Sequence, residues 1–136
     1  MLNTEGVDMA ISEAIREYNI SIQIVSSNKI AANAAVVKSG NEHFIFFNSR
    51  LPKSLYVLCF FHEVAHIYLN ELNCEASIYD KKVEYRVNIK AIHFIKPYIS
   101  LYMYFILNIL ANINEHLLYR YFSKKNKYIP KEFLNE

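Results

Sequence analysis

The chain has 136 residues, of which 53% are hydrophobic and 21% charged, and its formal net charge is +2. This length fits one domain with a core of its own, and the composition excludes an intrinsically disordered chain. The small net charge argues against direct binding of nucleic acid, which usually needs a strongly basic face.

The first third of the sequence predicts one helix followed by a small sheet. Apolar residues recur at helical spacing over residues 7–18, which indicates an amphipathic helix. Isoleucines alternate with polar residues over 20–24, a pattern typical of a half-buried strand. Residues 30–37 and 43–47 flank Gly40 and are predicted as a hairpin, because glycine readily supplies the positive φ of a tight turn. We therefore expect a mostly antiparallel sheet.

A helix is predicted from Lys53 to about Glu71, and it is apolar on nearly every face. Pro52 suits the first turn of this helix, where a missing N–H costs nothing. A helix that is apolar all round is usually buried. Its few polar residues, His62, Glu63 and His66, are therefore the feature that needs an explanation.

The last third of the sequence predicts further helices. One helix is expected from Asp80 to Lys96, where Pro97 stops it. One or two more are expected over residues 98–123. The apolar run at 98–111 is shorter than the ~20 residues that a membrane-spanning helix needs. We interpret this run as a buried core helix or as the interface of a homodimer, and we expect no membrane anchor.

Cysteines and basic residues give two smaller indications. The two cysteines, Cys59 and Cys74, together with an N-terminus that has no basic and apolar leader, predict a reducing, cytoplasmic setting. Lysines cluster only at Lys124, Lys125 and Lys127, and this cluster fits a solvated helix end rather than a phosphate-binding patch.

Residues 62–66 read His-Glu-Val-Ala-His. Positions i and i+4 share one face of a helix, so His62 and His66 can bind one cation. A catalytic zinc ion binds imidazole nitrogen and keeps an open position for water. Glu63 is rotated about 100° from His62 and can take a proton from that water as a general base. The motif therefore predicts a zinc-dependent peptidase, although manganese or iron can occupy similar ligands.

The third ligand of such a site must come from another segment. Glu84 is the best candidate, because it lies on the next predicted helix with Asn88 and Ala91 further along the same face. Small or polar residues on that face would let the two helices approach closely around a metal. The alternatives left open are Glu71, Glu75, Asp80 and His93.

Other residues near the motif have less specific interpretations. Cys59 is predicted as a small buried residue that supports the motif rather than as a ligand. Three histidines are predicted at the core edge or on the surface: His43, His93 and His116. An oxyanion that develops during hydrolysis needs a hydrogen-bond donor. Three tyrosines are candidates for that donor: Tyr68, Tyr79 and Tyr85.

The order of these segments resembles the ImmA/IrrE family of metallopeptidases, which occur on phages, on mobile elements and in bacterial stress-response operons. The resemblance covers about residues 20–96. It rests on a hairpin that ends at 43–48, on Leu51-Pro52, and on the helical segments 61–69 and 84–91.

This resemblance implies that His62, His66 and Glu84 bind the metal. In the family pattern E-x-x-A-N-x-x-A, Glu84 falls on the glutamate, Asn88 on the asparagine and Ala91 on the last alanine, while Val87 replaces the small residue before the asparagine.

The resemblance also implies a zinc-dependent endopeptidase that cleaves a separate helix-turn-helix repressor. The alternative is a non-proteolytic antirepressor that contains the metal and sequesters the repressor. The fold expected over residues 1–136 is a single α+β domain of gluzincin-like type. In it a small sheet packs on the motif helix and C-terminal helices close the core.

Overall fold

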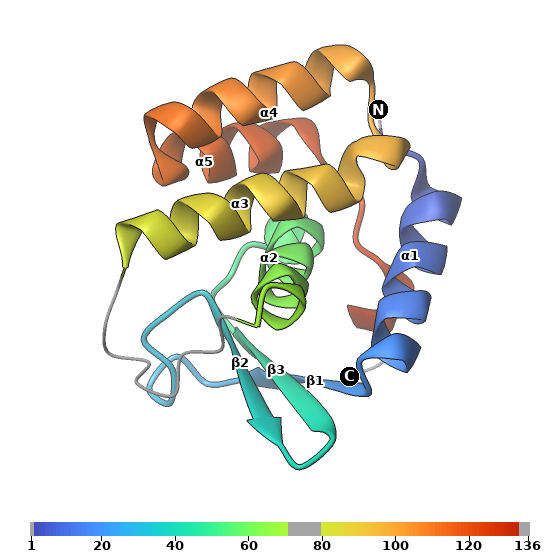
Figure 1. Cartoon of the computed structure of the whole chain (residues 1–136), viewed down its shortest axis with the longest axis vertical. Coiled ribbons are helices and arrows are strands. Elements are labelled where there is room, and N and C mark those ends of the chain that lie inside the picture. The colour runs from blue at the N-terminus through green and yellow to red at the C-terminus, as the bar shows by residue number, and fades with distance from the viewer. Residues whose placement is uncertain (1, 71–79, 134–136) are drawn as a thin grey trace.

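The computed structural model describes residues 2–70 and 80–133 (Figure 1). These residues form an α+β arrangement, as predicted. Its elements are α1 (Thr4–Glu17), β1 (Ile20–Val25), β2 (Ala34–Ser39), β3 (Glu42–Asn48), α2 (Tyr56–Tyr68), α3 (Lys81–Ile95), α4 (Leu101–Ile113) and α5 (Glu115–Lys125). Short 3-10 turns lie at Lys53–Leu55, Lys96–Tyr98 and Lys131–Phe133.

The three strands form one mixed sheet in the order β1-β3-β2. β2 and β3 make the predicted antiparallel hairpin, and Gly40 in its turn has a φ of 63°. β1 pairs with β3 in parallel, so that Ile20 lies opposite His43. The expectation of a mostly antiparallel sheet is therefore wrong for one of the two pairings. Alternation along a strand shows which face is buried, but it does not show which strand lies beside it.

Polar side chains mark the start of four helices. Asn3, Asp80, Ser100 and Asn114 each accept a hydrogen bond from a backbone N–H in the first turn of α1, α3, α4 and α5. Such caps satisfy N–H groups that have no partner within the helix. The motif helix α2 ends at Tyr68, earlier than predicted, because Asn70 adopts a left-handed φ of 54° that stops it.

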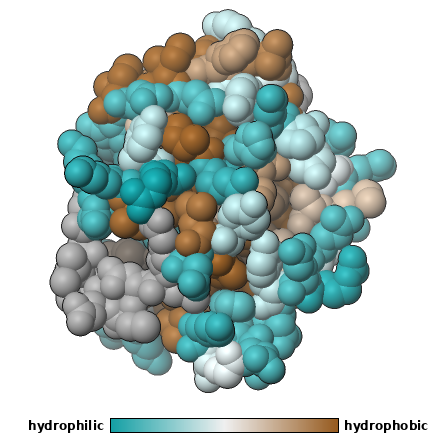
Figure 2. Space-filling model, viewed as in Figure 1, coloured by the Kyte–Doolittle hydropathy of each residue, from teal (hydrophilic) through white to brown (hydrophobic). Residues whose placement is uncertain are grey.

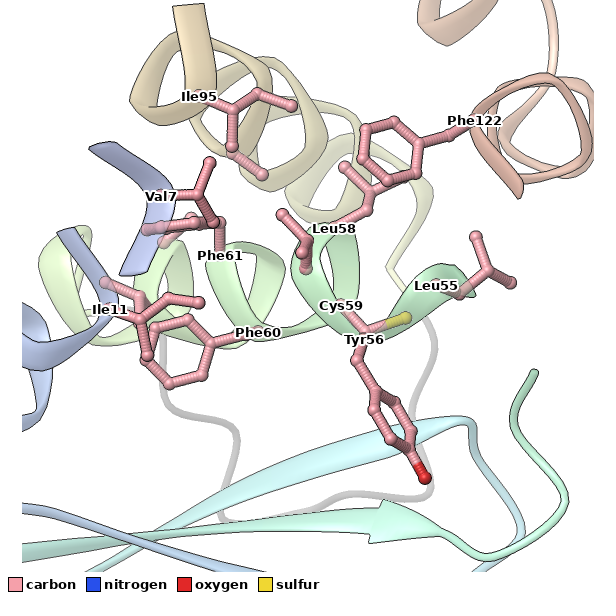
Figure 3. Packing of buried hydrophobic residues seen from close by; sticks show 14 of the residues in the cluster. Val7, Ile11, Leu55, Tyr56, Leu58, Cys59, Phe60, Phe61, Ile95 and Phe122 are labelled. Atoms are coloured by element: carbon pink, nitrogen blue, oxygen red, sulfur yellow. The ribbon is translucent and has the colours of Figure 1, made fainter. Parts of the chain in front are cut away.

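The motif helix is the centre of the molecule. In Figure 1, α2 lies between the sheet and α3, with α4 and α5 beyond α3 and α1 along one side. Every residue from Tyr56 to Ala65 is buried, which confirms the prediction of a buried helix. Side chains from α1, α3 and α5, among them Val7, Ile95 and Phe122, point toward α2 (Figure 3).

The apolar segment near the C-terminus is not a buried core helix, so that part of the prediction is wrong. It forms α4, of which Met103 and Leu107 are buried while Phe105, Ile109 and Ile113 are exposed. No helix among the described residues combines the length and the apolar composition that crossing a membrane requires.

Truncating a side chain of α2 should destabilise the fold strongly. Phe60 is fully buried and packs edge-on against Phe61 and Phe133. Phe60→Ala is expected to lower the free energy of unfolding by about 3–5 kcal/mol, measured by urea denaturation, because it leaves a cavity. Met9→Ala is the control, since Met9 is 63% exposed and should change stability by less than about 0.5 kcal/mol. Equal losses in the two variants would contradict the central position of α2.

Candidate metal centre

Three predicted ligands converge where α2 and α3 pack together. His62 and His66 lie one turn apart on α2, and their ring centroids are 5.0 Å apart. Glu84 of α3 faces both rings. Its Oε1 lies 3.1 Å from Nε2 of His62, and its Oε2 lies 3.3 Å from Nε2 of His66. One donor atom from each of these residues lies within 4.8 Å of the others, so the group can hold a metal ion.

The donor set and its spacing fit zinc. Ligand atoms bound tetrahedrally at 2.0–2.1 Å from zinc are about 3.3 Å apart, close to both nitrogen–oxygen distances observed here. The side chains of His62, His66 and Glu84 are 7%, 13% and 20% exposed. A site of this kind is shielded on most sides and still reachable from one.

A second layer of side chains orients His62. Asn88 of α3 lies behind the ring, with its Oδ1 2.8 Å from Nδ1 of His62. The Nδ2 of Asn88 donates to Oε2 of Glu115, at the start of α5, over 2.7 Å. Tyr119, one turn further along α5, lies 3.3 Å from the same Nδ1 and donates to Oδ1 of Asn88 over 3.4 Å.

This arrangement fixes a proton on Nδ1 of His62. A carboxylate can only accept hydrogen bonds, so Glu115 requires the amide of Asn88 to turn its NH₂ group outward. The amide oxygen then faces Nδ1 of His62, which must donate. Nε2 faces the carboxylate of Glu84, which also can only accept, so Nε2 donates to Glu84 in this structure. A metal ion bound at Nε2 would take the place of that proton.

The electrostatics of the centre favour a cation. Burial alone would lower the pKa of His62, but its hydrogen bond with Glu84 and the charge of Glu63 raise it to about 9. Burial would raise the pKa of Glu84, yet the hydrogen bonds from His62 and His66 lower it to about 2. The pKa of His66 is also raised, because its bond with Glu84 and the charge of Glu63 outweigh burial. Protons therefore compete with a metal for the same nitrogens.

Glu63 is a second acidic residue, besides Glu84, close to the two histidines. It follows His62 on α2 and is 5% exposed. Burial raises its pKa, while the charges of His62 and His66 oppose that rise. A shielded carboxyl with a raised pKa suits proton transfer near neutral pH.

Two of the other candidate ligands, Asp80 and His93, lie outside the cluster. Asp80 caps α3 by accepting hydrogen bonds from the N–H groups of Lys82 and Val83. His93 is exposed near the end of α3 and does not belong to the cluster. Glu71 and Glu75 lie outside the described residues, as do Cys74 and Tyr79.

The remaining predictions near the motif divide into those that the structure tests and those that it leaves open. Cys59 is a free thiol, 2% exposed and outside the cluster, as predicted. His43 is half-buried, and both His93 and His116 are exposed, also as predicted. Tyr68 packs edge-on against Phe94, and Tyr85 donates to Asn112. These contacts do not test the oxyanion role, which stays a prediction.

Sequence reasoning missed Glu115 and Tyr119. Both come from α5. Glu115 is 27 residues along the chain from Asn88, and Tyr119 is 57 residues from His62. An acidic residue in the first turn of a helix is commonly a complement to the helix dipole, so Glu115 carries no signal of its own. Tyr119 is one of 11 tyrosines in the chain, and nothing in the sequence distinguishes it from the others.

A groove leads from the surface to Glu84. Its volume is about 610 Å³, within the usual range for ligand sites. It is lined by the first turns of α3 and by the junction of α4 with α5, including Glu84, Tyr85, Asn88, Ile113 and Glu115. A segment of another molecule that entered this groove would therefore reach one member of the cluster.

No protein-family model, no curated protein and no solved structure matches this chain. The described residues nevertheless supply two imidazoles from α2 and one carboxylate from α3, which is a known donor set for catalytic zinc. With an open coordination position, such a set supports hydrolysis.

Removing a donor should weaken metal binding. His66→Ala and Glu84→Ala are each expected to lower zinc affinity by at least about 100-fold, because each removes one of three converging donors. The measurement is competition with a chromophoric chelator, together with the zinc content of the purified protein. His93→Ala, at an exposed histidine of α3, should keep the affinity of the unaltered chain. Unchanged affinity in Glu84→Ala would remove Glu84 as the third ligand.

The amide behind His62 should also matter. Asn88→Ala leaves Nδ1 of His62 without its acceptor and is expected to weaken zinc binding by about 10- to 100-fold. The nitrogen chemical shifts of the His62 ring should show a loss of the Nδ1-protonated form. Asn112→Ala, at an exposed asparagine of α4 that bonds Tyr85, is the matched control. Unaltered affinity and ring shifts in Asn88→Ala would contradict this role.

Proposed function

We propose that the chain is a zinc-dependent endopeptidase of the ImmA/IrrE type that hydrolyses a peptide bond in a separate protein. The observation that carries this proposal is the convergence of His62 and His66 with Glu84, a residue 22 positions along the chain on a different helix. If the five-residue motif had arisen by chance, a third donor from another helix would not be expected beside its two histidines.

Each residue of the centre has a role in the proposed reaction. When bound, zinc supplies Lewis-acid chemistry to the scissile carbonyl. Glu63 accepts a proton from the attacking water and returns it to the amine that leaves. Asn88 and Glu115 hold His62 in the tautomer that binds metal. Manganese or iron in place of zinc would use the same donors.

The groove beside Glu84 supports a peptide as substrate. Its volume of about 610 Å³ accommodates a few residues of extended chain but not a folded domain. A protein substrate must therefore present an exposed segment. That this protein is a helix-turn-helix repressor, and that the fold is gluzincin-like, follows from the resemblance of residues 43–48, 61–69 and 84–91 to the family.

The test is cleavage of a co-expressed candidate repressor by the full chain. Glu63→Gln is expected to keep bound zinc and to lower the cleavage rate by about 10²–10⁴-fold, because it removes the general base but no ligand. Glu42→Gln, at an exposed glutamate of β3, should leave both properties unchanged. A chelator should stop cleavage, and added zinc should restore it.

Two results would contradict the proposal. Full cleavage by Glu63→Gln would show that Glu63 is not the general base. Repressor that is bound but left intact by the unaltered zinc-loaded chain, with no effect of Glu63→Gln, would identify the sequestering antirepressor instead. Gel analysis of the repressor together with a pull-down distinguishes cleavage from binding.

A further inference from the structure

The outer face of α4 carries an unusual concentration of exposed apolar side chains. Of the nine large hydrophobic residues that are exposed in the described part of the chain, five lie on this helix. They are Leu101, Tyr102, Phe105, Ile109 and Ile113, and their exposed fractions run from 56% to 74%. Figure 2 shows hydrophobic atoms along the edge of the molecule formed by α4. We call these five residues the α4 face.

The spacing of these residues forms a continuous ridge. Leu101, Phe105, Ile109 and Ile113 are separated by four positions each and so lie in one row along the helix. The opposite side of α4 is already used, because Met103 and Leu107 are buried in the core. The exposed ridge is therefore not needed to hold α4 onto its own chain.

The area of the α4 face approaches that of one side of a protein interface. Five side chains exposed to this degree present on the order of 600 Å² of apolar surface. This is at the upper limit of the largest patch on a typical monomer, roughly 300–600 Å². A standard interface buries about 800 Å² per partner, so the α4 face would supply about three-quarters of that area.

The absence of charge from α4 indicates what covers this face. α4 contains no Asp, Glu, Lys or Arg. A helix that lies on a membrane surface usually carries Lys or Arg on its polar side, which α4 does not. A two-fold symmetric dimer uses the same surface on both copies, so a charge near the axis would meet its like. An uncharged ridge has no such repulsion, and the net charge of +2 on each chain adds little repulsion between two copies.

We propose that the α4 face binds the α4 face of a second copy of this chain in a two-fold symmetric dimer. Ridges formed by residues four apart interdigitate when two helices cross at about −50°, the commonest packing in globular proteins. At about 20 Å, a helix of 13 residues offers room for one such crossing. The pairing uses none of the metal-binding donors and so does not depend on the proposed function.

The test is sedimentation equilibrium of the full chain over a range of concentrations, with and without chelator. We expect a reversible monomer–dimer equilibrium that is unchanged by the chelator. Ile109→Glu and Phe105→Glu should each weaken the dimer by at least about 100-fold, because each brings like charges together in an apolar contact. Met9→Glu, at an exposed methionine of α1, is the matched control and should dimerise like the unaltered chain.

Circular dichroism checks that the variants fold. If a glutamate variant does not fold, Phe105→Ser provides an uncharged substitute. A chain that remains monomeric at every concentration would overturn the proposal, as would variants of the α4 face that dimerise normally. Assembly that continues beyond the dimer would overturn the closed pairing. A monomer that binds phosphatidylcholine vesicles through Phe105 and Ile109 would assign the face to a membrane surface instead.

Discussion

The burial of α2 is the constraint on which the rest of this structure depends. α2 is buried from Tyr56 to Ala65 and contributes more buried hydrophobic side chains than any other helix or strand, but it also carries His62 and Glu63 into the core. Polar and ionisable groups are costly to bury without partners. The neighbouring helices must therefore supply groups that bind them. α3 does so with Glu84 and Asn88, and its packing against α2 is stabilised by the same contacts that shape the centre.

The partners of His62 come from two helices, α3 and α5, and form a chain of hydrogen bonds. α5 places Glu115 against Asn88, Asn88 orients the imidazole of His62, and the imidazole directs Nε2 toward Glu84. Each step follows from a donor or acceptor that has only one possible role, since a carboxylate accepts and the amide NH₂ group donates. The geometry of the metal site is therefore set by tertiary packing well beyond the five residues of the motif.

This dependence explains how far the sequence could predict the site. The apolar stretch after Pro52 located α2, and the stop at Pro97 located the end of α3. The two motif histidines with Glu84 and Asn88 are four predicted polar residues that the structure brings together. Glu115 and Tyr119 could not be found, because nothing local in α5 shows which way it packs. The parallel pairing of β1 with β3 was missed for the same reason. Periodicity reports burial along one segment, whereas partners depend on how segments meet.

The two predicted alternatives for the segment that forms α4, a buried core helix and a dimer interface, could not be separated from the sequence for a different reason. The apolar composition of the segment was correctly noted, but composition alone does not separate a helix buried in its own core from one buried against another chain. The buried side, with Met103 and Leu107, and the exposed ridge are chemically alike. Ile113 ends this ridge and also lines the groove that reaches Glu84. A second copy seated on α4 would therefore border the approach to the metal centre without contacting its donors. The dimer interface and the entrance to the groove would then lie along the same edge of the molecule.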